Sequence, residues 1–270
     1  MHQPALALRL ARLHVYPIKS AAGLAPVEWP VDGFGLRHDR RWMVVDARGK
    51  MLSQRTHPRL ALARPSVVGD TLRVEAPGMP AIELPLEPVT RGGAATTVVV
   101  WDDTCSAQST GQRPARWFSE FLETDCSLVY MPDSTVRPAD PAYAPAGTRV
   151  SFADGFGFLL ISEESLADLN GRLDSALPMD RFRPNLVIAG GEPFGEDAMT
   201  DFMIAGIRFQ VVKPCDRCVI TTTNQLTLER GPEPLRTLAT YRRQGGKVLF
   251  GQNVVHQGTG RLRLGAPLQV

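Results

Sequence analysis

The stretch 211–224 reads VVKPCDRCVITTTN, and it is the most informative part of this sequence of 270 residues. Cys215 and Cys218 stand in a Cys-x-x-Cys spacing between two runs of apolar and β-branched residues. The thiolate form of cysteine binds metals and attacks electrophiles, and the neighbouring cations Lys213 and Arg217 would favour that form. The two cysteines are therefore candidates for metal binding or redox chemistry at the end of a strand.

Three interpretations of these two cysteines stay open on the residues alone. A closed zinc site needs four ligands, but Cys105 and Cys126 do not form a second close pair, and the sequence has no His-x3–5-His spacing. A dithiol redox motif usually opens a helix, whereas CVITTTN is typical of a strand. The third interpretation is two small buried residues that only pack.

Outward from this motif, many short apolar segments separated by Gly and Pro predict a mainly β protein with a few helices. Strands are expected in 8–18, 40–55 (a hairpin with its turn at 46–49), 61–78 (turn at 69–70), 186–190, 202–212, 218–224 and 247–270. Helices are expected at 114–122, after a cap at Ser162, and at 234–242. The segment 131–147 is rich in Pro, Asp and Ala and is typical of a link between two domains.

The composition excludes several classes of protein. A net charge of +2, from 30 Lys and Arg against 28 Asp and Glu, gives no general attraction to nucleic acid or membrane surfaces. No apolar run approaches the roughly 20 residues of a membrane-spanning helix, and the N-terminus lacks the apolar core of a signal peptide. Four cysteines in 270 residues do not make a disulfide scaffold, so we expect a cytoplasmic protein with free thiols.

A second group of residues is basic and is spread over distant segments. Lys19 and Ser20 follow the first strand, Arg40 lies in GLRHDRRW, and Arg183 and Asn185 lie in DRFRPNLVI. Guanidinium groups suit bidentate contact with phosphate, although any one of these residues alone would be interpreted as a solvated surface charge. The sequence contains no Gly-x-Ser-x-Gly elbow, no P-loop and no dinucleotide fingerprint.

Taken together, nine segments resemble the MOSC superfamily, and in particular its members with an N-terminal β-barrel domain. Those members include the mitochondrial amidoxime-reducing components, their bacterial relatives and the C-terminal region of molybdenum cofactor sulfurases. The matching segments occur in order over nearly the whole chain: HVYPIKSAAG, GLRHDRRWMVVD, SQRTHPRLAL, WDDTCSAQ, SFADGFGFLLISEESLADLN, RFRPNLVI, KPCDRCVITTTN, PEPLRTLATYR and LFGQNVV.

The resemblance implies an N-terminal β-rich barrel domain over 6–128, a MOSC β-barrel domain over 136–268, and a molybdenum cofactor (molybdopterin) in the cleft between them. Cys218 would be the protein ligand of the metal, and a soft thiolate suits a metal that already has two sulfur ligands. The residues expected to bind the cofactor are Lys19, Ser20, Arg40, Gly155, Arg183, Asn185 and Arg217.

The sequence departs from the family pattern at two positions near the expected site. Asp216 stands where relatives often carry a small hydroxyl residue, and we place it with Cys218 among the catalytic residues. Its carboxylate could bind water, protonate a leaving oxygen or accept from backbone N–H groups, and we favour the last. Gly155 and Phe156 stand where some relatives have a hydroxyl pair, so contact at Gly155 would be through the backbone.

The resemblance implies a molybdenum-dependent oxidoreductase, which we expect to be a monomer that reduces small N-hydroxylated substrates. Some bacterial relatives continue into an iron–sulfur domain that this sequence lacks, so electrons would come from a separate ferredoxin or flavoprotein. The alternative is a cofactor or sulfur carrier with Cys218 as the persulfide site. The family is also associated with pyridoxal phosphate, but we find no pyridoxal-phosphate desulfurase domain here. A third hypothesis is a structural barrel with an inactive site.

Overall fold

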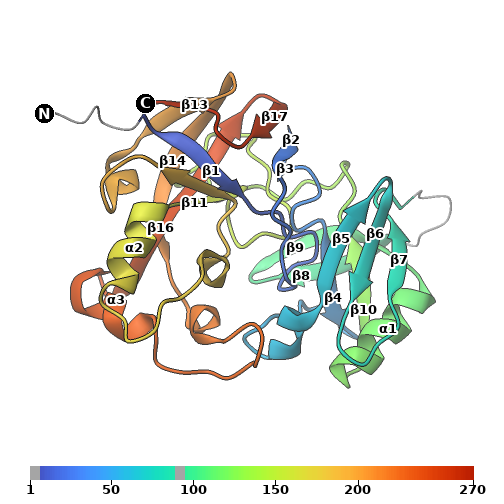
Figure 1. Cartoon of the computed structure of the whole chain (residues 1–270). Helices are drawn as coiled ribbons and strands as arrows, with labels where there is room; N and C mark the ends of the chain where they lie inside the picture. Colours follow the sequence, from blue (N-terminus) through green and yellow to red (C-terminus); the bar gives the residue numbers. More distant parts are fainter. Residues whose placement is uncertain (1–6, 89–94) are drawn as a thin grey trace, which may run out of the picture.

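The structure is a computed structural model that describes residues 7–88 and 95–270, and it is mainly β (Figure 1). In these residues there are three α-helices: α1 (Gln112–Leu122), α2 (Glu163–Asn170) and α3 (Leu235–Tyr241). The prediction of a mainly β fold with a few helices is confirmed. Within the described ranges, no helix combines the length and apolar character needed to cross a membrane.

The largest sheet has eight strands and forms a nearly closed barrel, whose interior is filled by apolar side chains such as Leu10, Phe158 and Phe209. Backbone hydrogen bonds between residues 8–10 and 265–268 join the two ends of the chain and help to close it. Its strands run in the order β1 (Arg9–Leu13), β12 (Leu186–Ala189), β11 (Phe158–Ser162), β16 (Lys247–Gln257), β14 (Ile207–Asp216), β13 (Asp201–Ile204) and β18 (Leu268–Gln269), with β15 (Arg243–Gln244) paired to β16.

Strand β1 comes from the start of the chain but lies in the sheet of the second half. It pairs antiparallel with β12, for example Arg9 with Ala189. A strand of the first predicted domain thus packs in the sheet of the second, so the packing of the strands does not follow chain order. The domain limits 6–128 and 136–268 stay predictions from the sequence.

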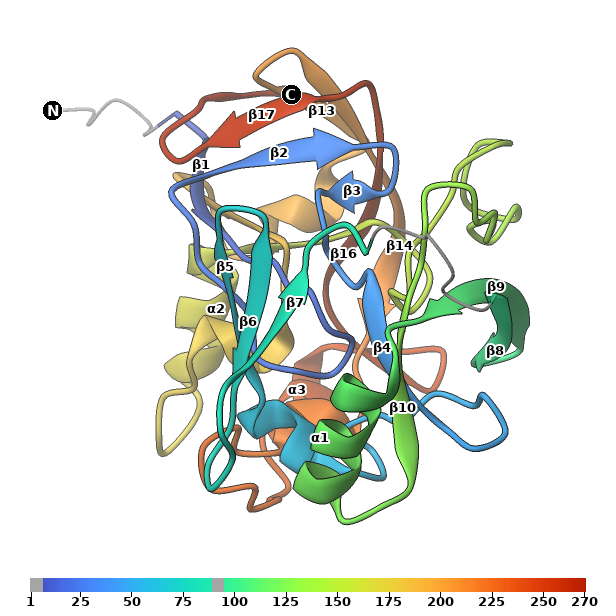
Figure 2. The same ribbon diagram turned by 90° about the vertical axis from the view of Figure 1, so that its right-hand side faces the viewer.

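Three smaller sheets make up most of the rest of the molecule, and the 61–78 hairpin is confirmed by the pairing of Val68 with Thr71. Helix α1 packs Trp117, Phe118 and Phe121 into the same core as Trp42. Figure 2 looks onto this side of the molecule, with α1 and the small sheet of residues 64–85 toward the viewer. The sheets are β4 (Trp42–Asp46), β10 (Cys126–Tyr130), β9 (Asp103–Ser109) and β8 (Ala95–Val100); β5 (Arg64–Val68), β6 (Thr71–Glu75) and β7 (Ile82–Pro85); and β17 (Gly260–Arg263), β2 (Glu28–Asp32) and β3 (Gly35–Leu36).

Two predicted elements differ in the structure. The segment 202–212 is a hairpin of β13 and β14 because Ala205 and Gly206 adopt positive φ and turn the chain. The segment 218–224 is wrong as a strand, since Val219–Thr222 form a 3-10 helix. Threonine hydroxyls here donate to backbone carbonyls, for example Thr221 to Cys218 at 2.9 Å, which favours a tight turn over a sheet ladder.

Candidate functional site

All nine residues selected from the sequence line one cleft, which lies between the barrel and the smaller sheets. Loops at strand ends supply most of them: the loop after β1, the loop before β4, the loop before β12 and the end of β14. The structure thus brings the whole predicted set together, while the role of each residue stays a prediction. The nine are Lys19, Ser20, Arg40, Gly155, Arg183, Asn185, Asp216, Arg217 and Cys218.

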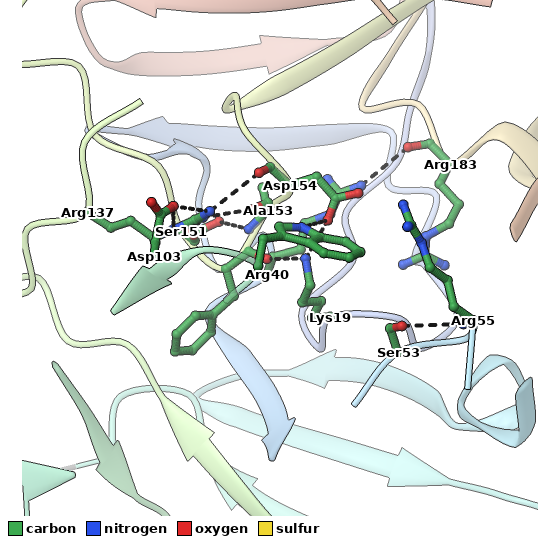
Figure 3. A network of polar contacts seen from close by, with 12 residues as sticks. Lys19, Arg40, Ser53, Arg55, Asp103, Arg137, Ser151, Ala153, Asp154 and Arg183 are labelled. Atoms are coloured by element: carbon green, nitrogen blue, oxygen red, sulfur yellow. Dashed lines mark hydrogen bonds and ion pairs between the residues drawn. The ribbon is translucent and has the colours of Figure 1, made fainter. Parts of the chain in front are cut away.

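Lys19 is a buried cation in the wall of the cleft (Figure 3). Its Nζ donates to the Phe152 carbonyl at 2.7 Å and to Asp154 Oδ1 at 2.5 Å. Burial lowers the pKa of Lys19, and the Asp154 charge opposes that effect. Desolvation in the cleft works against ionisation of Asp154, although its side chain is 67% exposed, but the Lys19 charge and hydrogen bond outweigh this effect and lower the pKa of that carboxyl. The Asp154 carboxylate therefore favours the charged form of Lys19 in the wall of the cleft.

The loop that carries Asp154 is held rigidly from its other side. Arg137, only 2% exposed, donates to the carbonyls of Ser151 at 2.6 Å and Ala153 at 2.7 Å. It also forms an ion pair with Asp103 at 2.8 Å (Figure 3). Because several acceptors of this loop are fixed by one guanidinium group, the carbonyl and carboxylate that hold Lys19 are fixed as well.

Arg40 and Arg183 meet at the ring of the buried Tyr16, with guanidinium carbons 4.5 and 4.2 Å from its centre. Arg40 also donates to Asp39 at 2.5 Å and to Asn185 Oδ1 at 2.9 Å. Stacking on an aromatic face and hydrogen bonds to fixed acceptors orient both guanidinium groups before any ligand binds.

Arg183 is a cleft cation well suited to bind an anion. Its Nη1 donates to the Ala21 carbonyl at 2.6 Å, and within residues 7–88 and 95–270 it forms no ion pair with a carboxylate. Burial lowers its pKa to about 10, so the group is still charged at neutral pH. A charged guanidinium without a carboxylate partner in a cleft favours a bound anion such as phosphate.

The two cysteines of the 211–224 stretch are both free thiols in the same cleft. Cys218 lies directly before the 3-10 helix, and its sulfur has no hydrogen-bond partner in the described part of the chain. Cys215 Sγ accepts from Arg217 Nη1 at 3.0 Å, while Arg217 Nη2 donates to the Phe182 carbonyl at 2.6 Å. Cys218 is therefore the thiol left available for a ligand.

Asp216 lies at the edge of the cleft with its side chain 45% exposed. Its carboxylate is 3.8 Å from Lys247 Nζ, and no backbone N–H donates to it among the described residues. The expectation that backbone N–H groups hold Asp216 is therefore wrong. The register explains the contact, because Asp216 pairs with Leu249, two residues from Lys247, and alternate residues of a strand share a face.

The structure adds cleft residues that were missed in the sequence, among them Ser53, Trp101, Asp154 and Asn253. Trp101 Nε1 donates to Asp154 at 3.1 Å, and Trp101 has a positive φ of 55° in the turn between β8 and β9. A tryptophan at a turn is the one local signal that could have identified any of them, because large apolar residues rarely occupy such positions.

The donor set of the cleft fits a phosphorylated, sulfur-rich metal cofactor. Lys19, Arg40, Arg183 and Arg217 supply charge-assisted donors, and Nε of Arg217 is buried without a hydrogen-bond partner in the part of the chain that the structure describes. The Cys218 sulfur supplies a soft ligand in the same cleft. Phosphate, polar rings and a soft metal would each find matching groups here.

The sequence is similar to known proteins along almost its whole length. The family described as MOSC N-terminal beta barrel domain matches residues 7–125, and the MOSC domain matches residues 147–269. Mitochondrial amidoxime-reducing component 1 of Homo sapiens is 31% identical over 96% of this chain and 82% of that protein. Molybdenum cofactor sulfurases of Danio rerio and Arabidopsis thaliana are each 34% identical over 92% and 90% of this chain. The chain spans 32% of the length of each sulfurase.

Proposed function

Because the chain belongs to the family that joins a MOSC N-terminal β-barrel domain to a MOSC domain, we propose that it is a molybdenum-cofactor oxidoreductase that reduces small N-hydroxylated compounds. The observation that carries the proposal is the free Cys218 thiol in one cleft with four cations. Relatives similar over most of their own length, and named amidoxime-reducing component, support this function over the others.

Each part of the cleft would hold one part of the cofactor. Lys19, Ser20, Arg40 and Arg183 would bind the phosphate, and Cys218 would bind the molybdenum. Asn185, Arg217 and the backbone at Gly155 would contact the pterin. When bound, the cofactor supplies a metal centre that changes its oxidation state by two electrons.

The protein itself would supply charge balance and a path for protons. Reduction of an N–OH group consumes two electrons and two protons, breaks the N–O bond and releases water. Asp216, half-exposed at the edge of the cleft, would pass a proton to the departing oxygen, and Lys247 Nζ lies 3.8 Å from its carboxylate. The electrons would come from a separate ferredoxin or flavoprotein.

The proposal is tested by comparing Cys218→Ala with Cys215→Ala, both expressed in a host that makes the cofactor. Cys218→Ala should lose metal and at least about 100-fold in benzamidoxime reduction with reduced methyl viologen, since the metal ligand is gone. Cys215→Ala, a thiol in the same cleft, should keep its molybdenum and most of its rate. Equal rates for wild type and Cys218→Ala would contradict the proposal.

A sulfur or cofactor carrier is the second candidate, and the sulfurase relatives favour it, since they match over at least 90% of this chain. It predicts a persulfide on Cys218, detected by mass spectrometry of the intact protein, with no turnover of N–OH compounds. We also propose a cytoplasmic location, because all four cysteines are free thiols. Cell fractionation would test it.

A further inference from the structure

Four aromatic residues line the cleft, and they differ in how far a ligand could reach each ring. Phe158 and Phe182 are fully buried and belong to the packed interior. Trp101 is covered by a protein group, because the guanidinium carbon of Arg55 lies 4.3 Å from its ring centre. Phe156 is half-buried, and in residues 7–88 and 95–270 no cation lies over its ring. Phe156 is therefore an aromatic ring of the cleft that a ligand can contact.

The chain on either side of Phe156 leaves space for such a contact. Gly155 and Gly157 flank it and have no side chains that could cover the ring. Gly155 lines the cleft too, and a Cβ built on it would meet no atom of the described residues within 4 Å. A phenyl ring has no hydrogen-bond donor or acceptor, so Phe156 can recognise a ligand only by apolar and aromatic contact.

The Phe156 side chain is held in place by a second aromatic ring. Tyr143 meets it edge to face, with ring centres 6.4 Å apart and planes at 87°, a geometry that aromatic pairs prefer. Lys213 Nζ lies 4.4 Å from the centre of the Tyr143 ring. Phe156 also packs against a small buried cluster formed by Ala139, Ala144 and Val255. Because these contacts exist before a ligand binds, little side-chain freedom would be lost on binding.

The same contacts place Phe156 beside the strand that leads to the metal-ligand candidate. Lys213 is a residue of β14 and pairs with Asn253 of β16, which lines the cleft. Asn253 Nδ2 donates at 3.4 Å to the carbonyl of Pro214, four residues before Cys218. A ligand that rests on Phe156 would therefore lie next to the part of the cleft that carries Cys218.

We propose that Phe156 is a specificity-determining residue of the substrate site, and that it selects N-hydroxylated compounds in which the N–OH-bearing group is attached to a planar aromatic ring. The inference rests on the proposed function and names the substrate class of that site. The ring of the substrate would pack against Phe156 in the open space beside Gly155, and its N–OH group would point toward Cys218. A small alkyl substituent would leave the Phe156 ring uncovered.

Two amidoximes that differ only in this substituent test the proposal: benzamidoxime carries a phenyl ring and acetamidoxime a methyl group. Phe156→Leu keeps an apolar side chain but removes the ring. Phe194→Leu is the matched control, because Phe194 forms a similar edge-to-face pair with Tyr241, at 6.0 Å, and lies outside the cleft. Tyr143→Leu tests the support of Phe156 by its neighbour.

All four proteins, wild type included, are made in a host that supplies the cofactor, and their molybdenum content is compared. The rates of reduction of both amidoximes are measured with methyl viologen as the electron source. Binding of both amidoximes is measured separately by isothermal titration calorimetry on the oxidised protein without a reductant, so that no turnover occurs.

Phe156→Leu should lower the ratio of kcat/KM for benzamidoxime to that for acetamidoxime by about tenfold, because one aromatic contact is lost. The change should lie in KM for benzamidoxime, since the ring contact is the same in the ground state and the transition state. The ratio of the two binding constants should fall by a similar factor. Tyr143→Leu should lower both ratios less, and Phe194→Leu should keep them within about twofold of wild type.

Unchanged ratios in Phe156→Leu would overturn the assignment. Equal losses for the two amidoximes would also overturn it, because they would show a general change in the shape of the cleft. A wild type that binds acetamidoxime as tightly as benzamidoxime would do the same. If wild type binds benzamidoxime through Phe156 but reduces neither compound, the proposed function fails, whereas the aromatic subsite stands.

Discussion

At the scale of single residues, the cleft depends on an exposed carboxylate that neutralises a buried cation. The Asp154 side chain is 67% exposed, whereas that of Lys19 is 6% exposed. The same arrangement occurs outside the cleft, where Asp133, 87% exposed, pairs at 2.6 Å with Arg41, 3% exposed. The two pairs allow the effect on stability to be separated from the effect on ligand binding.

We predict that Asp154→Asn and Asp133→Asn each lower the free energy of unfolding by about 1 kcal/mol, because each removes a charge-assisted but solvent-screened contact. Only Asp154→Asn should also weaken the hold on the cofactor, by about tenfold, because Lys19 then ionises less readily in the cleft. Urea denaturation and molybdenum content after dialysis measure the two effects. A similar loss of molybdenum in Asp133→Asn would contradict the assignment of Lys19 to the phosphate.

Sequence reasoning found Lys19 but missed Asp154, and the cause is physical. A lysine next to a serine after a strand is a local signal for an anion site. Asp154 stands in SFADGFGF as an ordinary loop residue, and only the fold brings it to Lys19 from 135 residues away. Residues that bind the expected anion could be predicted, whereas residues that balance those charges could not.

At the scale of elements, a loop of the second half is tied to a loop of the first half beside the cleft. Arg230 donates to the backbone carbonyls of Gln54 and Arg55 and to Thr223 Oγ1. Gln54, fully buried, donates in turn to the Ser20 carbonyl at 2.6 Å. Ser20 has a positive φ of 67°, so this chain of hydrogen bonds holds a backbone conformation that serine rarely adopts.

We predict that Arg230→Ala lowers the free energy of unfolding by about 1–2 kcal/mol and speeds loss of the cofactor, because the Ser20 turn loses its support. Arg230→Lys should lie between wild type and Arg230→Ala, since an ammonium group cannot fork to two carbonyls. Arg236→Ala is the control, because among the described residues the Arg236 side chain pairs with Glu233 alone and is 67% exposed; it should cost less than about 0.5 kcal/mol. Thermal unfolding and cofactor release rates check these expectations, and equal effects in the two alanine variants would refute them.

The elements themselves were mostly readable from the sequence, because periodicity and turn residues act over a few positions. The hairpin around 69–70 and the cap of α2, where Ser162 Oγ accepts from the Ser165 N–H at 3.0 Å, are confirmed. The failure at 218–224 has a specific origin. Thr, Val and Ile favour strands by packing, but here the threonine hydroxyls bond to nearby carbonyls and select a 3-10 turn.

At the scale of the whole molecule, two buried histidines make the fold sensitive to acid. Burial lowers the pKa of His14 and of His38 to about 4, compared with 6.5 for a free histidine. Between pH 6.5 and 4 the unfolded chain therefore binds up to two more protons at these sites than the folded protein does. Protons then favour unfolding, so stability from this source is constant above about pH 6.5 and falls below it.

We predict that acidification from pH 6.5 toward pH 4 lowers the free energy of unfolding through these sites by up to about 2.7 kcal/mol per pH unit, at about 1.4 for each proton. His38→Asn should remove about half of that slope, because one of the two sites is gone. Urea denaturation at pH 7, 6 and 5 measures the slope. An unchanged slope in His38→Asn would show that His38 takes up no extra proton on unfolding.

The position of β1 also determines when the protein can fold as it is made. Its hydrogen-bonding partners are β12 and the segment 265–268, so β1 leaves the ribosome long before the segments with which it pairs. Throughout synthesis Leu10 and Leu13, fully buried in the finished protein, stay without their partners and are available to chaperones. A fragment that contains only the second half would lack β1. Its β12 would then be an open edge, ready to pair with another chain.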